Sequence, residues 1–152
     1  MTFTVERKSV LAAAADEVWA RVTTWEGVND ELRPILRMTV PRGARGMTID
    51  SVEPGTRPGR AWILLGGLVP VDYDDLGLAE VEPGRRFRER STTLSLRRWE
   101  HERTVAPRGT GCEVIDRLTF EPRVPGTGRI ARAIVGALFG HRHRRLARRF
   151  AR

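Results

Sequence analysis

A histidine and an aspartate stand in two neighbouring apolar runs of the sequence, where their side chains could exchange a proton. His101 lies in the run RRWEHERTVA and Asp116 in the run CEVIDRLTF, and the segment PRGT at 107–110 separates them. Alternating apolar and polar residues on both sides of a turn-forming segment predict a β-hairpin. An imidazole beside a carboxylate is an arrangement used in general acid–base chemistry.

The pairing of this hairpin decides which side chains meet. If Ala106 and Gly111 are the last paired residues, His101 lies opposite Asp116, and Arg103 shares their face because side chains alternate along a strand. The other residues of this face are mostly apolar: Trp99, Val105, Cys112, Val114, Leu118 and Phe120. The sequence therefore predicts that His101, Arg103 and Asp116 point towards the protein interior.

Three interpretations of this cluster remain open. A buried carboxylate is costly unless a cation or hydrogen-bond donors lie beside it, so His101, Arg103 and Asp116 could simply satisfy one another and stabilise the sheet. They could instead anchor a ligand in an apolar pocket. In the third interpretation His101 and Asp116 are catalytic, with Asp116 orienting the ring and His101 moving a proton.

The elements that must position the hairpin form an α+β layout. The sequence predicts a strand over 3–10, a helix over 13–25 that ends at Gly27, and a short helix near 28–33 before Pro34. Further strands are expected over 35–40, 47–52, 61–67, 76–82, 86–93, 95–106 and 111–121, and a long helix over about 129–150 with apolar positions Ile130, Ile134, Leu138, Leu146 and Phe150. Such an order predicts a curved antiparallel sheet around the last helix, with a cavity between them.

Several segments resemble the START-like superfamily, also called SRPBCC, which has the helix-grip fold. The helical segment ADEVWARV resembles the family's N-terminal part, and RRWEHE, VIDRLTFEP, GTGRIA and RRLARRF resemble a bacterial branch described as cyclase/dehydrase or ligand-binding proteins. The likeness spans essentially the whole chain, as one domain over residues 1–152. One position departs from the pattern, because many relatives carry a histidine or an aromatic residue where this chain has Arg103.

The resemblance implies a small hydrophobic or amphipathic ligand, such as a lipid, a polyketide or an aromatic metabolite, in the cavity between sheet and helix. The alternatives are a polyketide cyclase/dehydratase-type enzyme using His101 and Asp116, and an interaction module using the last helix. The residues expected to line the ligand site are Trp62, Leu64, Tyr73, Trp99, His101, Arg103, Asp116, Leu118, Ile134 and Leu138. No cofactor is expected.

The net charge of +8 is concentrated at the C-terminal end of the chain. Residues 1–126 carry 19 basic and 19 acidic side chains, whereas residues 127–152 carry eight arginines and no acid. Cations favour a helix C-terminus, and an arginine-rich helix can also contact an anionic membrane surface. Nucleic acid is disfavoured because no aromatic residues are interleaved with the arginines. The sequence leaves open a monomer or a homodimer.

Composition points to a folded protein in a reducing compartment. Hydrophobic residues make up 40% of the chain, the N-terminus lacks the pattern of a signal peptide, and the longest apolar stretch, at 130–139, is far shorter than the roughly 20 residues of a membrane span. The single cysteine, Cys112, excludes an internal disulfide. We therefore expect a cytoplasmic protein.

Other candidate sites are weaker. The stretch VPVDYDDLG at 69–77 places Asp72, Asp74 and Asp75 close together, which suggests a solvated turn rather than a metal cage. His141 and His143 point in nearly opposite directions on a helix, so they cannot chelate one metal ion. The sequence predicts no metal site.

Overall fold

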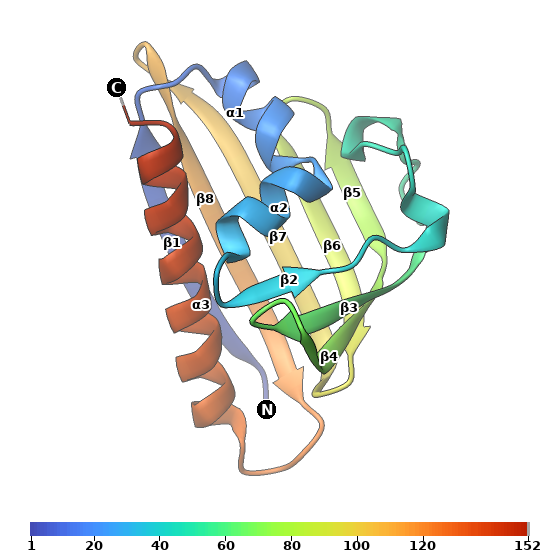
Figure 1. Cartoon of the computed structure of the whole chain (residues 1–152). Coiled ribbons are helices and arrows are strands. Elements are labelled where there is room, and N and C mark those ends of the chain that lie inside the picture. The colour runs from blue at the N-terminus through green and yellow to red at the C-terminus, as the bar shows by residue number, and fades with distance from the viewer. Residues whose placement is uncertain (152) are drawn as a thin grey trace.

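The computed structural model describes residues 1–151 and shows a curved antiparallel sheet with one long helix packed along it (Figure 1). The elements, in chain order, are β1 (Phe3–Leu11), α1 (Ala15–Val22), α2 (Trp25–Leu32), β2 (Leu36–Met38), two 3-10 turns (Arg42–Ala44 and Ile49–Ser51), β3 (Gly59–Leu65), β4 (Val69–Leu76), β5 (Leu78–Glu82), β6 (Arg86–Thr93), β7 (Leu96–Arg108), β8 (Gly111–Pro122) and α3 (Gly128–Arg149). The strands follow the order β1-β8-β7-β6-β4-β3-β2, and β5 pairs with β6. The predicted helix-grip α+β fold is confirmed.

The two longest strands, β7 and β8, pair two residues away from the predicted register. Arg108 and Gly111 form the last pair, so the turn has two residues, and Gly109 adopts the positive φ that such a turn needs. Arg103 therefore lies opposite Asp116, and His101 lies opposite Leu118. A shift of two residues leaves each side chain on its predicted face, because the alternation has a period of two.

The buried face of α3 differs from the predicted apolar face. Val135, Phe139, Leu146 and Phe150 are buried at helical spacing, and Arg142 and His143 lie on the same face. The predicted positions Ile130 and Ile134 are instead exposed. A search for apolar side chains alone misses this face, because two of its central residues are polar and find buried partners on other elements.

The interior contains two apolar clusters separated by polar side chains. The first lies beneath α1, where the end of β7, the start of β8 and the C-terminal end of α3 meet. Its residues include Trp19, Val105, Val114, Leu146 and Phe150. The second lies further along the same strands and helix, and includes Leu96, Leu118, Phe120, Val135 and Phe139. On β8, Asp116 is the inward-facing residue between Val114 of the first cluster and Leu118 of the second. A carboxylate therefore separates the two clusters on this strand.

Three local predictions are corrected. The helix predicted over 13–25 ends at Val22, and the second helix, predicted near 28–33, begins at Trp25 because Thr24 accepts a hydrogen bond from the Gly27 amide. Gly27 therefore lies inside α2 rather than ending α1. Residues 49–51 form a 3-10 turn in place of the expected strand. The stretch expected to be a solvated turn contains β4, in which Asp74 is buried on the inner face while Val69 and Val71 are exposed.

Among residues 1–151, no helix is both long and apolar enough to cross a membrane.

Candidate functional site

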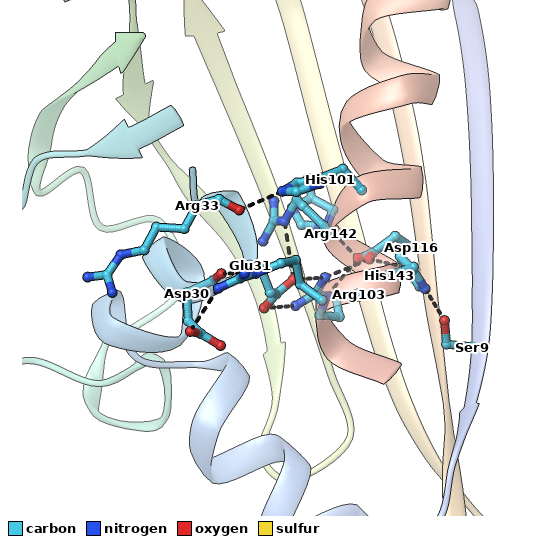
Figure 2. Close-up of polar contacts among 11 residues, drawn as sticks. Ser9, Asp30, Glu31, Arg33, His101, Arg103, Asp116, Arg142 and His143 are labelled. Carbon is cyan, nitrogen blue, oxygen red and sulfur yellow. Dashed lines mark hydrogen bonds and ion pairs between the residues drawn. The ribbon is translucent and has the colours of Figure 1, made fainter. Parts of the chain in front are cut away.

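Arg103 lies at the centre of a polar layer that crosses the interior between the two apolar clusters (Figure 2). Its side chain projects from β7, and its guanidinium donates to Asp116 on β8 through Nε and Nη2, at 2.8 and 2.7 Å. On the other side, Nη1 and Nη2 donate to the two carboxylate oxygens of Glu31 on α2, at 2.9 and 2.7 Å. Arg103 thus holds two carboxylates through paired hydrogen bonds, a geometry that suits the planar guanidinium.

Asp116 accepts four hydrogen bonds from three side chains. Besides the two from Arg103, His101 Nε2 lies 2.6 Å from Oδ1, and Nε2 of His143 on α3 lies 2.7 Å from Oδ2. An ionised carboxylate only accepts, so each imidazole must present an N–H at Nε2. Both oxygens of Asp116 are therefore saturated by protein groups, and the side chain is fully buried.

The layer continues from His143 to the edge strand of the sheet. Nδ1 of His143 lies 2.6 Å from the hydroxyl oxygen of Ser9 on β1. With the proton of a neutral His143 ring on Nε2, Nδ1 is an acceptor and the Ser9 hydroxyl donates to it. Ser9, His143 and Asp116 thereby connect β1, α3 and β8.

Glu31 joins the layer to α2. It accepts a third hydrogen bond from Arg142 Nε at 3.2 Å, and the Arg142 guanidinium lies over the Phe139 ring, 4.7 Å from its centre. One turn further, Arg145 donates to the backbone oxygen of Asp30 at 2.9 Å. The carboxylates of Glu31 and Asp116 are thus balanced by the guanidiniums of Arg103 and Arg142.

These ion pairs shift the pKa values of the buried groups. Burial alone would raise the pKa of Asp116, but Arg103 and His101 outweigh it and hold the pKa well below its ordinary value. The same holds for Glu31, whose pKa is lowered because Arg103 and Arg142 outweigh the effect of burial. Burial would lower the pKa of Arg103, yet the two carboxylates raise it. Asp116, Glu31 and Arg103 are therefore all charged at neutral pH.

His101 differs from the other members of the layer because one of its two ring nitrogens has no partner among the described residues. Nε2 faces Asp116, whereas Nδ1 makes no hydrogen bond to any of residues 1–151. The ring packs edge-on against Phe87 and Phe139, with centroids 5.5 and 5.1 Å apart, and its centroid is 6.5 Å from that of Trp99. His101 therefore presents a ring nitrogen without a protein partner among aromatic side chains, and this nitrogen is an acceptor when the ring is neutral. Trp99 is only half-buried.

The other residues expected to line a ligand site fall into three positions. Leu118 is fully buried in the second apolar cluster, and Leu138 packs against that cluster while partly exposed. Ile134 is 62% exposed. Leu64 is half-buried beside an irregularity in the pairing of β3 with β4.

Trp62 and Tyr73 lie on the outer face of the sheet, which corrects their expected position. They are opposite each other on β3 and β4, with ring centroids 5.5 Å apart. The adjacent pair, Ala61 and Asp74, is buried on the inner face, and neighbouring residues of a strand point to opposite faces. These two rings therefore do not face α3.

A third buried carboxyl group, outside the polar layer, lies on the inner face of β4. Asp74 is only 5% exposed, and its Oδ1 has no hydrogen-bond partner among the described residues. Burial and the nearby Glu89 carboxylate raise its pKa well above the ordinary value. Glu89 lies opposite His101 in the β6–β7 pairing and accepts a hydrogen bond from Ser91 at 2.6 Å. Asp74 thus belongs to the same concave face as His101.

Two hollows open at the surface, and neither touches the polar layer. One of about 240 Å³ is lined by Glu17, Arg21, Arg149 and Phe150. The other, of about 380 Å³, lies between α2, β2 and the turn at Gly66 and Gly67. Within residues 1–151 no cluster of three or more histidine, cysteine or acidic side chains is arranged to hold a metal ion.

The sequence analysis missed five residues of the polar layer and its surroundings: Ser9, Glu31, Asp74, Arg142 and His143. His143 and Arg142 follow Phe139 and precede Leu146 at helical spacing, and this signal could have placed them on the buried face. Glu31 and Ser9 carry no such signal, because their partners lie 72 and 134 residues away along the chain.

The fold is similar to that of solved helix-grip structures, which include a START superfamily protein. A START superfamily protein from Mycobacterium smegmatis is similar over 97% of this chain and 96% of its own, with 14% identity and a TM-score of 0.69. Protein CV1439 from Chromobacterium violaceum covers 98% of both chains, with 15% identity and a TM-score of 0.70. DynU16, from the dynemicin biosynthetic locus, is similar over 94% of this chain and 46% of its own, with 18% identity and a TM-score of 0.60.

At the level of sequence, the model of one family matches residues 9–150, and its description is domain of unknown function DUF8410. The match covers nearly the whole chain, so the protein belongs to this family. No curated protein matches it at a significant level.

Proposed function

We propose that the protein binds a small amphipathic molecule against the concave face of the sheet, beside His101. The observation that carries this proposal is the state of the His101 ring: Asp116 holds Nε2, and Nδ1 has no partner among residues 1–151. A nearly buried acceptor that no protein group uses favours a ligand with a hydroxyl or another donor.

Aromatic and aliphatic side chains next to His101 favour an apolar ligand body. Trp99 and Phe139 pack with centroids 6.2 Å apart, and both lie close to the His101 ring. Leu138 borders this group from α3 and stays partly exposed, and Ile134 lies one helical turn before it. An aromatic or lipid-like molecule resting here would remove these apolar side chains from water.

The remaining polar residues support His101 rather than contact the ligand. Arg103 and Asp116 are fully buried, and protein groups satisfy both oxygens of Asp116. We assign them the task of fixing the tautomer and the orientation of the imidazole, as carboxylates do for histidines in other sites.

A pair of matched probes tests the hydrogen bond directly. We would measure binding of 2-naphthol and 2-methoxynaphthalene by calorimetry to the wild-type protein and to His101→Phe. The hydroxyl donates to Nδ1 only in the wild type, so His101→Phe should weaken 2-naphthol binding about tenfold, the size of one buried hydrogen bond. It should leave 2-methoxynaphthalene binding within about twofold, because the aromatic surface is kept.

Two results would overturn this proposal. One is that neither probe binds the folded wild-type protein. The other is that His101→Phe changes the affinity for both probes equally, which would show that the hydroxyl of 2-naphthol does not donate to Nδ1. His141→Phe is the matched control, because His141 lies on α3 with Nε2 2.6 Å from the Arg33 backbone oxygen, outside the polar layer.

A cyclase/dehydratase-type activity is a second candidate, favoured by the same hydrogen bond. An imidazole with Nε2–H held by a carboxylate has Nδ1 available as a base. His101 could remove the α-proton of a β-hydroxy ketone and then donate this same proton to the β-hydroxyl, which leaves as water as the carbon–carbon double bond forms. Conversion of a β-hydroxy ketone to the enone would support it if His101→Ala abolishes turnover and Asp116→Asn alters its pH dependence. Binding of the β-hydroxy ketone without turnover would leave ligand binding as the proposed function.

A further inference from the structure

The turn between β3 and β4 exposes apolar side chains where polar residues are usual. It reads Leu65-Gly66-Gly67-Leu68-Val69, and Leu68 at its tip is 84% exposed, with Leu65 and Val69 at 50% and 56%. Gly66 and Gly67 have positive φ values of 63° and 81°, so the tight turn needs these two glycines. Exposed apolar side chains gathered on one surface feature mark a site of interaction.

The backbone of this turn is already satisfied from within. The amides of Gly66, Gly67 and Leu68 donate to the backbone oxygens of Ile35, Leu64 and Leu65, at 2.7, 3.3 and 3.2 Å. Ile35 is also exposed and stands directly beside the turn. A hairpin tip whose amides are bonded internally can leave water at a low cost, which an unsatisfied loop cannot do.

Two arginines lie immediately behind this apolar tip. Arg33 and Arg37 line the hollow of about 380 Å³ that Gly66 and Gly67 also border. Both side chains are exposed, and neither forms an ion pair with any acidic side chain in residues 1–151. Glu26 also borders the hollow, but it pairs with Arg21 at 3.0 Å. The hollow therefore has an uncompensated positive charge.

We propose that the β3–β4 hairpin docks on an anionic lipid bilayer, with Leu68 and its apolar neighbours at the boundary of headgroups and acyl chains, and Arg33 and Arg37 at the phosphates. A bilayer has phosphates at its surface and acyl chains beneath them. The unpaired arginines would meet the phosphates, and the apolar side chains in front of them would reach the acyl chains. A protein partner with only an apolar patch leaves the two guanidiniums without a counter-charge. This docking does not depend on the ligand site beside His101.

The surface differs from the arginine-rich end of α3, which the sequence put forward for the same partner. That end lies beside α1 in Figure 1, away from the β3–β4 hairpin. Two of its arginines are engaged, Arg142 with Glu31 and Arg145 with Asp30. Arg148 and Arg149 are exposed and provide a matched control. Arg152 lies outside the described residues.

Vesicle sedimentation tests the docking. The full chain would be mixed with vesicles of phosphatidylcholine alone, or of equal parts phosphatidylcholine and phosphatidylglycerol. We expect binding to the anionic vesicles only. The variant Leu68→Ser/Val69→Ser should lower the partition coefficient about tenfold or more, since two exposed apolar side chains no longer leave water. Arg33→Gln/Arg37→Gln should lower it about twenty-five-fold, from about fivefold for each lost cation near the surface. Arg148→Gln/Arg149→Gln removes the same charge and should change it less than twofold.

A tryptophan at the tip reports the contact itself. In Leu68→Trp the emission, after subtraction of the wild-type spectrum, should shift to the blue on adding anionic vesicles, and lipids brominated on the acyl chain should quench it. Three outcomes would overturn the proposal: no binding of the wild-type protein to anionic vesicles, an unshifted emission from Leu68→Trp while this variant is bound, or loss of binding in the Arg148/Arg149 variant with the tip variants unaffected. The last outcome would assign the membrane contact to α3.

Discussion

Arg103 and Asp116 stand opposite each other in the β7–β8 pairing, and two parallel hydrogen bonds of 2.8 and 2.7 Å join them inside the sheet's concave face. The same guanidinium reaches Glu31 on α2, so one side chain connects the sheet to the helix that begins after Thr24. Since Arg142 and His143 bring α3 to the same two carboxylates, the polar layer joins β7 and β8 to both α2 and α3.

Loss of the Arg103 guanidinium should be strongly destabilising. Arg103→Met leaves Glu31 and Asp116 buried with too little positive charge, and removal of one partner of a buried ion pair costs about 3–5 kcal/mol. Arg103→Lys should recover only part of this, because an ammonium group cannot form the paired hydrogen bonds to both carboxylates. Urea unfolding measures the loss, with the exposed Arg98→Met as control; a cost below about 1 kcal/mol for Arg103→Met would contradict the role assigned to the layer.

Acid should weaken the fold through the same two carboxylates. The pKa values of Glu31 and Asp116 are lower in the folded protein than in the unfolded chain. Their contribution is therefore complete above about pH 5, and it is lost as the pH falls from the unfolded values of about 4 through the folded values. We expect the free energy of unfolding to decline below about pH 5, and Glu31→Gln to show a shallower decline from a lower starting stability. If the free energy of unfolding declines equally with pH in the wild-type protein and in Glu31→Gln, Glu31 does not contribute to the acid sensitivity.

Asp74 should have the opposite effect on the pH dependence. Its pKa is raised in the folded state, so its contribution is present below about pH 4 and is lost as the pH rises through the folded value. Asp74→Asn keeps a neutral side chain of the same shape. We expect it to stabilise the protein at about pH 7 by about 1–3 kcal/mol, because Asn avoids the cost of the raised pKa, and each pKa unit corresponds to about 1.4 kcal/mol. The gain should vanish near about pH 4. Asp75→Asn, on the outward-facing neighbour, should lack this pattern.

The tryptophans on the inner and outer faces of the sheet should respond differently to a ligand. Trp99 packs beside His101, whereas Trp62 packs edge-on against Tyr73 on the outer face. In a nitrogen-15 NMR spectrum, the indole signal of Trp99 should shift when 2-naphthol is added, and the signal of Trp62 should stay in place. Trp99→Phe and Trp62→Phe assign the two signals. A shift of Trp62 alone would place the ligand on the outer face of β3 and β4.

Much of the hairpin followed from local alternation. Apolar and polar residues alternate through β7 and β8, and this period of two placed His101, Arg103 and Asp116 on the inner face even though the pairing was two residues off. The pairing itself depends on the turn, and Gly109 allowed a two-residue turn where four residues were expected. The segment of β4 was instead expected to be a solvated turn, and its acidic residues hid the strand, in which Val69, Val71 and Tyr73 face outwards and Asp74 faces inwards.

The sequence by itself determined the α+β layout, with a curved antiparallel sheet and a long last helix, and the inward faces of β7 and β8, because these depend on periodicity and turn residues that are local along the chain. Only the tertiary structure decided which groups satisfy Asp116 and Arg103. Glu31 and His143 reach them from α2 and α3, 72 and 27 residues away, and no local pattern encodes a contact that forms only when the helices close over the sheet. The same closure decided that His101 keeps Nδ1 free and that Leu68 remains in water, since both depend on what the rest of the chain covers.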